Sequence, residues 1–468
     1  MGSLAELLLR AFEAGGRPIE SVDGQCERPE DLLALAETVR RKLLDREITA
    51  NEPVHVRIGN RPSDLGALLG IWRASAVAVP LHVAAALSTV ERLQRATGAR
   101  YSIDGDRIDA IGPSPPQHRP LLRSAALVIF TSGSTGEPKG VVIGHQRLAG
   151  KLMVLDRLLC IDSSEVVLCP LQLTFIFGLW VALLTLIKGA RLILMPKFSR
   201  DAMERGLADA TAAAGVPTMF RELVKLSTES ASGLRLILTG GEVLAPALAH
   251  EMQRFSPAAI YDLYGLTETG SCDFCVGPAD QPQGFGSIGR PTAEVVFRLV
   301  KDGRPAEAGE TGELQIRTPF GMLGYLDNPE LMAASFDGGY FKTGDLARAS
   351  ADGGVALVGR AKDIISRGGN KIAPLEIDNL LTGHPDIAAA LCAGVPNERL
   401  GEVIHAAIVP RQNARIDEGA LREWLLGRIE RFKVPDVFHL CDALPSGPTG
   451  KADRRAVARL AAERSKRR

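Results

Sequence analysis

The segment best suited to chemistry runs from Leu127 to Gly140 and reads LVIFTSGSTGEPKG. An apolar stretch leads into a loop of hydroxyls and glycines that holds one lysine. Glycines let a backbone approach phosphate closely, and amide N–H groups, hydroxyls and Lys139 supply donors and positive charge. A Walker loop needs Gly-Lys-Ser/Thr at the start of a helix, but here Pro138 precedes the lysine and Gly140 follows it. The residues therefore indicate a phosphate loop of another type, and a plain surface turn would rarely concentrate so many of these residue types.

Further polar segments follow this loop along the chain. They are TGGE (Thr239–Glu242), YDLYGLTET (Tyr261–Thr269), YFKTGD (Tyr340–Asp345), GRAKDIISRGGNKIAPLEI (Gly359–Ile377) and LPSGPTGKADRR (Leu444–Arg455). Taken singly, each has an ordinary structural interpretation. Thr-Glu after a Tyr-Gly turn is typical of a helix N-terminus, Thr-Gly-Asp of a β-turn, and a lysine near a basic terminus of a solvated surface. Their order along one chain is the informative feature.

Together with the loop, these segments resemble the motifs of the adenylate-forming superfamily, which includes acyl-CoA synthetases, luciferase and the adenylation domains of peptide synthetases. The similarity spans roughly Ala126 to Arg455 and is greatest to acyl-CoA synthetases. The resemblance implies an AMP-forming acid–thiol ligase. Such an enzyme activates a carboxylic acid with ATP and Mg²⁺, releases pyrophosphate, and passes the acyl group to the thiol of CoA.

The resemblance also assigns an ATP site. Tyr264 would pack on adenine, Thr267 would contact the α-phosphate, Glu268 would hold Mg²⁺, and Asp345 and Arg360 would contact the ribose. A hard cation prefers carboxylate and phosphate oxygens, which agrees with the role of Glu268. The full predicted ATP-binding set is Thr131, Ser132, Gly133, Ser134, Thr135, Gly136, Lys139, Gly240, Gly241, Glu242, Tyr264, Thr267, Asp345, Arg360 and Lys451.

The predicted catalytic residues are Lys451, Thr267, Glu268 and Lys362. By resemblance, Lys451 bridges the carboxylate and the α-phosphate, where a mobile cation stabilises the charge that gathers as two anions join. Lys362 marks a hinge about which a small domain rotates between the two half-reactions, and a polar, solvated residue suits a hinge. The loop of Arg367, Gly368 and Gly369 would close over the pantetheine arm of the thiol.

An acyl pocket is expected to include Phe175, Ile176, Phe177, Gly178 and Gly265. Members that activate amino acids hold the amine with an Asp, which would fall at Ile176. Because an unpaired buried ammonium is costly, an α-amino acid is not the expected substrate. The apolar and aromatic surroundings favour a weakly polar aryl or aliphatic acid, whose identity the sequence leaves open.

Two alternatives to CoA ligation stay open at this point. The acyl group could pass to the phosphopantetheine of an acyl carrier protein, which presents the same thiol arm. The chain could also be a non-catalytic nucleotide-binding homologue, although the presence of Glu268, Asp345 and Lys451 argues against that interpretation.

Composition limits the possible partners and location. Lys plus Arg and Asp plus Glu number 55 each, so no overall field attracts nucleic acid. Seven cysteines without framework spacing fit a cytoplasmic protein, and the single pair Cys272 and Cys275 is expected to pack rather than bind zinc. The uncharged run from Val166 to Ile187 is interrupted by Pro170, Gln172 and Gly178, which favours a buried strand–helix–strand passage over a membrane span.

The fold class expected is α/β, because short apolar strands alternate with helical stretches. We expect a large N-terminal domain of stacked α/β subdomains with a β-rich subdomain (residues 1–361), and a small, mobile α+β C-terminal domain (residues 362–468). The first subdomain is expected to be trimmed relative to the family. The individual elements expected are a helix at the start of the chain, strands at 126–130, 190–195, 234–239, 258–261, 388–395 and 405–409, short strands within 294–318, and helices at 200–214, 372–381 and 420–430.

Overall fold

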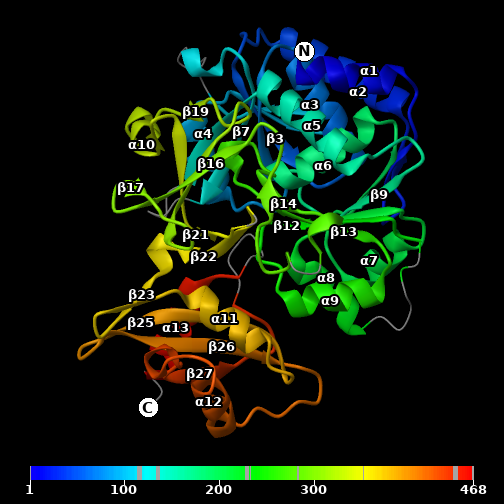
Figure 1. Cartoon of the computed structure of the whole chain (residues 1–468). Helices are drawn as coiled ribbons and strands as arrows, with labels where there is room; N and C mark the ends of the chain where they lie inside the picture. Colours follow the sequence, from blue (N-terminus) through cyan, green and yellow to red (C-terminus); the bar gives the residue numbers. More distant parts are fainter. Residues whose placement is uncertain are drawn as a thin grey trace.

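The computed structural model describes residues 2–112, 119–132, 138–226, 231, 233–281, 284–351, 353–445 and 452–465. Its strands form four sheets, three in a large body and one in a small body that follows it in the chain (Figure 1). The helices are α1 (Leu4–Glu13), α2 (Pro29–Leu44), α3 (Pro62–Arg73), α4 (Leu87–Thr97), α5 (His145–Leu159), α6 (Ile176–Ile187), α7 (Arg200–Leu207), α8 (Pro217–Leu226), α9 (Pro246–Phe255), α10 (Pro329–Ala334), α11 (Pro374–Thr382), α12 (Glu418–Leu426) and α13 (Arg454–Ser465).

Two large sheets share the main core. The first has the order β19-β8-β7-β4-β3-β5-β6 and the second β15-β14-β13-β12-β11-β9-β10-β1-β2. Strands of the first sheet are β3 (Pro53–Ile58), β4 (Val77–His82), β5 (Tyr101–Asp104), β6 (Arg107–Ala110), β7 (Ala125–Ser132), β8 (Pro138–Gly144) and β19 (Gly324–Tyr325). Strands of the second are β1 (Ile19–Ser21), β2 (Cys26–Glu27), β9 (Val166–Cys169), β10 (Arg191–Leu194), β11 (Ala212–Gly215), β12 (Leu236–Gly240), β13 (Ala259–Tyr264), β14 (Phe274–Val276) and β15 (Arg290–Pro291).

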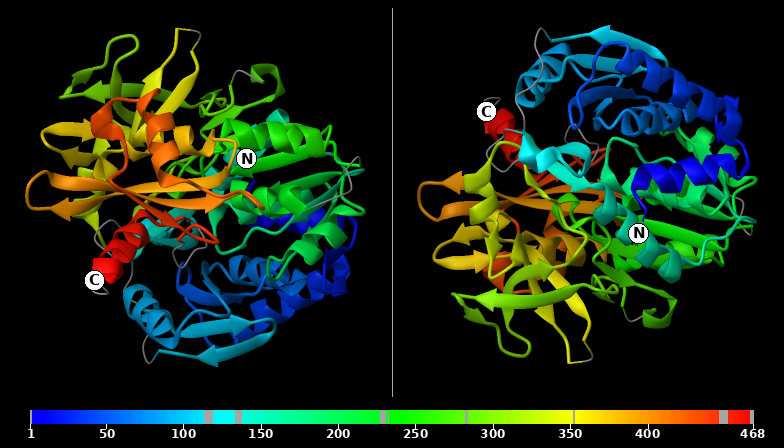
Figure 2. Two further views of the ribbon diagram at one scale, coloured as in Figure 1. Left: turned by 90° about the horizontal axis from the view of Figure 1, so that it is seen from below. Right: turned by 90° about the horizontal axis from the view of Figure 1, so that it is seen from above.

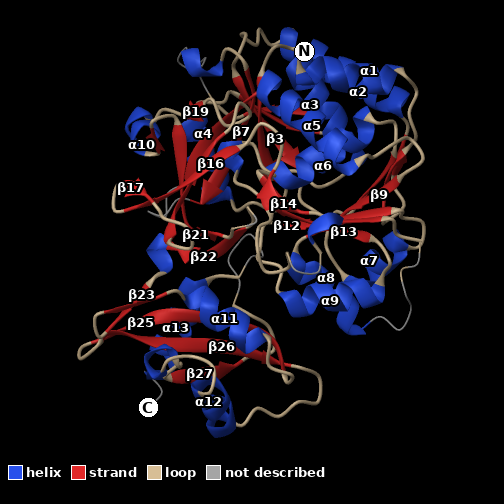
Figure 3. Ribbon diagram, viewed as in Figure 1, coloured by secondary structure: helices blue, strands red, loops and turns tan. Residues whose placement is uncertain are grey.

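Helices α1, α2, α3, α5 and α6 lie between these two sheets, and α7, α8 and α9 cover the outer face of the nine-stranded sheet (Figures 1 and 3). The packing of strand β12 explains why its sequence is continuously apolar. Leu236 and Leu238 face the inner core, whereas Ile237 faces the outer cluster with Phe220 of α8 and Leu248 of α9. A parallel strand covered by helices on both faces has no solvent side, so strict alternation disappears.

The third sheet is built mostly from antiparallel hairpins. Its order is β17-β16-β18-β21-β20, with β22 paired to β21, and its strands are β16 (Val296–Lys301), β17 (Arg304–Pro305), β18 (Thr311–Arg317), β20 (Phe336–Asp337), β21 (Tyr340–Ala349) and β22 (Val355–Arg360). The small body, coloured mainly orange in Figure 2, holds the fourth sheet. Its order is β24-β23-β26-β25, with β27 on β26. Its strands are β23 (Ile365–Arg367), β24 (Asn370–Ile372), β25 (Ile387–Asn397), β26 (Gly401–Pro410) and β27 (Val437–Leu440). The predicted boundary at 361/362 falls in a 3-10 helix, η4 (Ala361–Asp363), and the division into two domains stays a prediction.

Most of the elements expected from the sequence form. The first helix buries Leu4, Leu8 and Phe12. The uncharged run becomes β9 and α6, and β10 follows it as the second strand of the expected passage. No helix in the part of the chain that the structure describes has the length and apolar character needed to cross a membrane. One expectation was wrong in part, because helix α7 ends at Leu207 and residues 212–215 form β11 instead. Alanines favour helix intrinsically, but in the β11 run their small side chains fit a strand buried on both faces.

An ion pair connects the small body to the large one, and its removal should loosen the connection. Arg411, just after β26, donates to Glu251 Oε1 of α9 at 2.8 Å. Ion pairs of this exposure contribute about 0.2–1 kcal/mol, so Glu251→Gln should speed tryptic cleavage after Arg360 and Lys362 by about 1.5- to 5-fold. Glu376→Gln is the matched control, because it removes a 2.8 Å ion pair to Lys433 within the small body. Cleavage of Glu251→Gln at the wild-type rate would show that the pair contributes nothing to docking.

Candidate active site

The phosphate loop predicted from sequence is carried by the β7–β8 hairpin. Thr131 pairs with Lys139, and Ser132 pairs with Pro138, in antiparallel register. The predicted residues Gly133, Ser134, Thr135 and Gly136 lie outside the described residues. Leu127, Val128 and Ile129 of β7 are fully buried, so the strands that flank the predicted loop are anchored in the core.

Tyr325 links this hairpin to the Thr-Glu motif, and sequence reasoning missed it. The Tyr325 strand, β19, pairs with β8, which places the Tyr325 ring 5.6 Å from Nζ of Lys139 in a cation–π arrangement. Its hydroxyl donates to Glu268 Oε1 at 3.1 Å. Burial and the neighbouring Glu268 carboxylate raise the pKa of Tyr325, so the phenol stays a donor at neutral pH. Tyr325 belongs to none of the recognised motifs, and no signal in the sequence singled it out.

The motif residues Thr267 and Glu268 sit in a short 3-10 helix, η2 (Thr267–Thr269), directly after β13. The chain then reverses at Gly270, whose φ of +86° is left-handed, and returns as β14. Backbone hydrogen bonds close the turn: Ser271 N donates to Leu266 O at 2.8 Å and Asp273 N to Tyr264 O at 2.7 Å. Met322 N donates to Glu268 O at 2.8 Å from the strand connection opposite. The ordinary interpretation of this motif as a helix start is thus locally correct, and the turn also presents Thr267 and Glu268.

Glycines allow the backbones around this turn to touch. A Cβ on Gly240, at the end of β12, would lie 2.3 Å from Leu263 O, and a Cβ on Gly265 would lie 2.3 Å from Cys272 N. No side chain fits either contact without backbone movement. The structure therefore places Gly265 against the returning chain of its own turn.

Asp345 is the centre of a second polar cluster, on the third sheet. It is 2% exposed, accepts from Tyr264 Oη at 2.6 Å, and pairs with Arg360 Nε at 3.0 Å. Burial and the Asp345 carboxylate raise the pKa of Tyr264 well above its usual range. The tight turn expected before Asp345 is a bulge inside β21, because Thr343 and Gly344 fall between the Lys342 and Leu346 pairings with β18. The two clusters thus meet at the end of β13.

Glu242 has one satisfied and one unsatisfied carboxylate oxygen. Its Oε2 accepts from Thr218 N at 3.2 Å and from Thr218 Oγ1 at 2.7 Å, whereas its Oε1 is buried without a hydrogen-bond partner. Thr239 Oγ1, near the end of the preceding strand β12, is also buried without a hydrogen-bond partner. Buried polar atoms rarely go unpaired, so these two atoms fit a donor-bearing ligand beside Gly241, where the family resemblance predicts the nucleotide.

The predicted acyl segment begins α6. Phe175 is 39% exposed at the N-cap, Ile176 is 5% exposed, and Phe177 stacks on Trp180 with ring centroids 5.4 Å apart. A Cβ on Gly178 would lie 2.5 Å from Gln172 O, so this helix start packs tightly on the chain before it. Trp180 Nε1 donates to Ser271 Oγ at 3.3 Å. The acyl segment and the Thr-Glu turn are therefore direct neighbours.

The remaining predicted residues belong to the small body and its connection. Lys362 is exposed in η4, where partial desolvation and Arg360 lower its pKa. Arg367 donates to Phe432 O at 2.7 Å and pairs with Asp436, all within the small body, while Gly368 and Gly369 form the exposed β23–β24 turn with positive φ. Among the described residues, no hydrogen bond or ion pair joins Arg367, Gly368 or Gly369 to the clusters around Glu268 and Asp345. Lys451 lies outside the described residues.

The flanks of the Lys451 segment are nevertheless firmly placed. Asp453 N donates to Pro445 O at 2.8 Å, which closes the segment at its base. Arg454 then donates to Cys392 O at 2.6 Å and pairs with the buried Asp378 at 2.5 Å. The base of the segment is thus fixed to β25 and α11 of the small body.

The donor chemistry around Glu268 fits Mg²⁺ held jointly with phosphates. A magnesium ion in phosphate-transfer sites commonly takes one or two carboxylates, substrate oxygens and waters. Glu268 supplies a carboxylate with one protein donor on Oε1. Within the described ranges no group of three or more His, Cys, Asp or Glu side chains is placed to hold a metal by itself.

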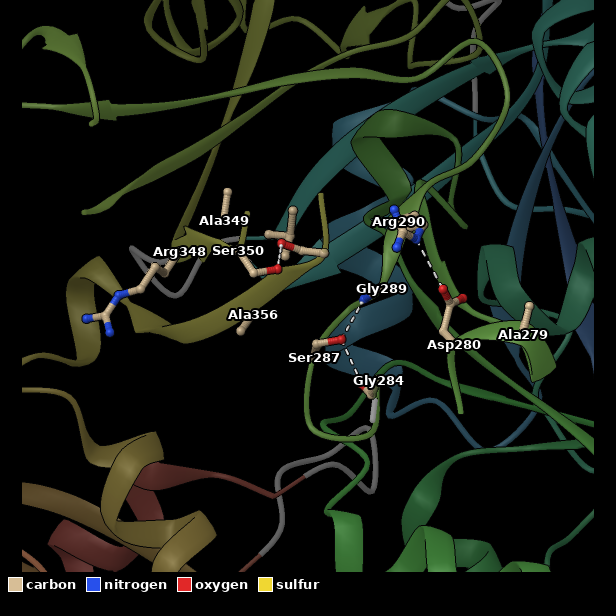
Figure 4. Close-up of a pocket in the computed structure, with 12 residues that line it drawn as sticks. Ala279, Asp280, Gly284, Ser287, Gly289, Arg290, Arg348, Ala349, Ser350 and Ala356 are labelled. Atoms are coloured by element: carbon tan, nitrogen blue, oxygen red, sulfur yellow. Dashed lines mark hydrogen bonds and ion pairs between the residues drawn. The ribbon is translucent and has the colours of Figure 1, made fainter. Parts of the chain in front are cut away.

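A separate hollow of about 390 Å³ lies between the β14–β15 connection and the β21–β22 hairpin (Figure 4). Its wall includes Asp280 and Arg290, which form a 3.1 Å ion pair, and the backbone around Ser287, whose hydroxyl donates to Gly284 O at 2.7 Å. None of the predicted site residues lines it.

Comparison with known proteins decides the family. The AMP-binding enzyme family matches residues 102–326, and the AMP-binding enzyme C-terminal domain matches residues 376–451. The chain is 33% identical to a feruloyl-CoA synthase of Amycolatopsis over 387 residues, 81% of this chain and 78% of that protein. It is 35% identical to a sulfoacetate–CoA ligase of Cupriavidus necator over 352 residues, 74% of this chain and 68% of that protein. This chain belongs to the AMP-binding enzyme family.

Structural comparison agrees with this assignment. ATP-bound MatB from Rhodopseudomonas palustris superposes with a TM-score of 0.86 at 25% identity, covering 98% of each chain. The predicted superfamily, its affinity with acyl-CoA synthetases, the α/β fold class and the acid–thiol ligase class are therefore confirmed. The roles assigned to single residues stay predictions.

Asp262 offers a pH test of the strand that leads into the site. It is 8% exposed in β13, and burial raises its pKa to about 8. Since the unfolded carboxyl titrates near 3.8, the unfolded chain releases a proton that the folded chain keeps, and the free energy of unfolding falls as pH rises from about 4 to 8. Asp262→Asn removes this loss. Its Tm advantage over wild type should therefore grow between pH 5 and pH 8 and level off above; a difference independent of pH would refute a buried, proton-retaining carboxyl.

Proposed function

We propose that this enzyme activates a weakly polar carboxylic acid with ATP, forming an acyl-adenylate and pyrophosphate, and then transfers the acyl group to the thiol of CoA with release of AMP. The observation that carries the proposal is the convergence of distant motifs on one turn. Tyr264, at the end of β13, bonds Asp345 of the third sheet, and Glu268, four residues later, bonds Tyr325 next to Lys139. Family membership and the CoA ligases among the relatives support the reaction class.

The residues divide the chemistry of the first step among them. Lys139 would supply positive charge to the phosphates, and Thr267 would donate to the α-phosphate. Glu268 would hold Mg²⁺, which neutralises phosphate charge when bound. Asp345 would accept from the ribose hydroxyls in place of the Tyr264 phenol, while Arg360, with Nε 3.0 Å from Asp345 Oδ1, orients the carboxylate. Lys451, on its segment of the small body, would span the attacking carboxylate and the α-phosphate.

The second step requires the small body to present another surface. Arg367 is bonded within the small body, and Gly368 and Gly369 are exposed away from the polar clusters. Lys362 lies in the connection between the bodies. We therefore assign Lys362 to a hinge, about which rotation withdraws Lys451 and brings the glycine turn over the thiol arm. CoA is the favoured acceptor. A carrier-protein phosphopantetheine is the second candidate, because it would present the same arm.

Lys451→Ala should separate the two half-reactions. Pyrophosphate exchange should fall by about a hundredfold or more, because a cation that stabilises transition-state charge is lost. Thioester formation from supplied acyl-adenylate and CoA should stay near the wild-type rate, because the lysine has left by then. Lys433→Ala is the control, since Lys433 pairs with Glu376 and Glu430 inside the small body. Equal loss in both half-reactions of a folded Lys451→Ala protein would remove the assigned role.

The substrate class is tested by pyrophosphate release over a panel of carboxylic acids, with CoA, with holo carrier protein and with neither. Benzoate-like and medium-chain acids should exceed every free α-amino acid in kcat/KM by about a thousandfold, since an uncompensated buried ammonium costs several kcal/mol. The relatives named as feruloyl, indoleacetate and sulfoacetate ligases act on different acids, so the panel includes aryl, aliphatic and sulfonated members.

Paired variants at Ile176 check the pocket assignment. Ile176→Asp and Ile176→Asn remove the same buried side chain, but only Asp adds a negative charge near the acid. Exchange with the preferred acid should be at least about tenfold lower for Asp than for Asn. Similar rates in two folded variants would place Ile176 outside the pocket, and preferred activation of an α-amino acid would reject the alignment of this segment.

A further inference from the structure

A lysine and an aspartate are paired in the interior beneath the Thr-Glu turn, and no motif includes either. Lys151, on α5, and Asp273, just before β14, are both 0% exposed. Nζ of Lys151 donates to Cys272 O at 2.9 Å and lies 3.5 Å from Asp273 Oδ1. The Phe320 ring sits 5.4 Å from the same ammonium. The ammonium is thus held by one carbonyl, one carboxylate and one aromatic face.

Burial of such a pair is not explained by stability. Removing two charges from water costs several kcal/mol per ion, and apolar replacements of similar volume are often as stable or more stable. A buried ion pair has another consequence. The direction and length of the contact between the two side chains restrain the backbone segments that carry them. Here α5 is rigidly packed through Leu148, Leu152 and Leu155 in the main core, so the lysine is the fixed partner and the turn is the segment that it restrains.

Asp273 transmits this restraint to the turn through both its side chain and its backbone. Its Oδ2 accepts from Thr269 Oγ1, and Thr269 directly follows Glu268. Its N–H donates to Tyr264 O at 2.7 Å, the residue that bonds Asp345. Lys151 holds the neighbouring carbonyl of Cys272, and Trp180 holds Ser271. The segment that contains Thr267 and Glu268 is therefore held at Thr269 by the Asp273 side chain and at Tyr264 by the Asp273 N–H.

We propose that Lys151 and Asp273 are positioning residues for adenylation: they hold the Thr267–Glu268 turn at the geometry that the phosphates require, without touching the substrate. The proposal rests on the proposed function, and it assigns to this pair an effect on the first half-reaction alone. A pair that served only stability would affect both half-reactions through the amount of folded protein.

The test compares Lys151→Met, Asp273→Asn and the double variant Lys151→Met/Asp273→Asn with wild type. Folding is followed by thermal unfolding, the first half-reaction by acid-dependent pyrophosphate exchange, and the second by thioester formation from supplied acyl-adenylate and CoA. The control is Lys188→Met/Asp156→Asn. It removes a half-buried 3.0 Å Lys–Asp pair that also involves α5 but does not contact the turn.

Each single variant should lower Tm, because it leaves one buried charge unpaired, and the double variant should recover most of that loss. The double variant should nevertheless keep pyrophosphate exchange at least about tenfold below wild type, with thioester formation within about twofold. The control should leave both rates unchanged.

Thr269→Val keeps the test decisive if the double variant does not fold, because it retains the ion pair and removes only the Thr269 hydroxyl, which bonds Asp273 Oδ2 and the backbone of Leu266 within the turn. It should show the same selective loss of exchange. Proportional loss of both half-reactions, or exchange at the wild-type rate in a folded variant, overturns the proposal. Absence of acid-dependent exchange in wild type overturns the proposed function instead, so the two failures are distinguishable.

Discussion

The short turn after β13 has to carry polar side chains while its backbone passes through an apolar interior. Cys272 and Phe274 on its return path are 1% and 0% exposed. Each buried N–H and C=O in such a passage needs a partner, since an unsatisfied group costs about 1–3 kcal/mol. Within the turn, the carbonyls of Leu266 and Tyr264 accept from the N–H groups of the returning chain. From outside it, Met322 N donates to Glu268 O and Lys151 Nζ donates to Cys272 O. The placement of Thr267 and Glu268 follows from this closure.

The same closure explains why distant parts of the chain are joined here. Residue 325 reaches Glu268 because β19 adds to the edge of the seven-stranded sheet beside β8. Asp345 reaches Tyr264 because the bulge in β21 turns its carboxylate inward, and Thr343 Oγ1 stabilises the bulge by donating to Leu314 O at 2.6 Å. Each of the three sheets of the large body thus contributes one polar residue near the end of β13. These residues are Tyr325, Tyr264 and Asp345. Sites at the carboxyl ends of parallel strands are expected in α/β folds, where the loops of neighbouring strands meet.

Much of the fold and the identity of the motifs could be predicted from the sequence, because glycine-rich and turn residues mark loops and apolar runs mark buried strands. The glycines and hydroxyls around Lys139 singled out that residue, whereas Glu268 and Asp345 were assigned by the resemblance of their motifs to a known family. Tyr325 and the pair of Lys151 and Asp273 were not found in either way, since their importance depends on partners more than 50 residues distant, for which the sequence gives no local signal. The strand at 212–215 was missed for a related reason: burial on both faces overrides the helical preference of alanine.

The contrast between the two kinds of ion pair in this molecule bears on how it can move. The pair of Lys151 and Asp273 is fully buried in the large body. Because breaking this pair would leave a buried charge unpaired and unsolvated, the turn that the pair restrains is held at one geometry. The pair of Arg411 and Glu251 lies between the bodies with side chains 35% and 19% exposed, where water can replace either partner at little cost. A polar connection around Lys362 and an exchangeable ionic contact are compatible with the proposed rotation of the small body. The interior that holds the Thr267–Glu268 turn need not change if the small body rotates as proposed, so one rigid site could serve a sequence of two chemical steps.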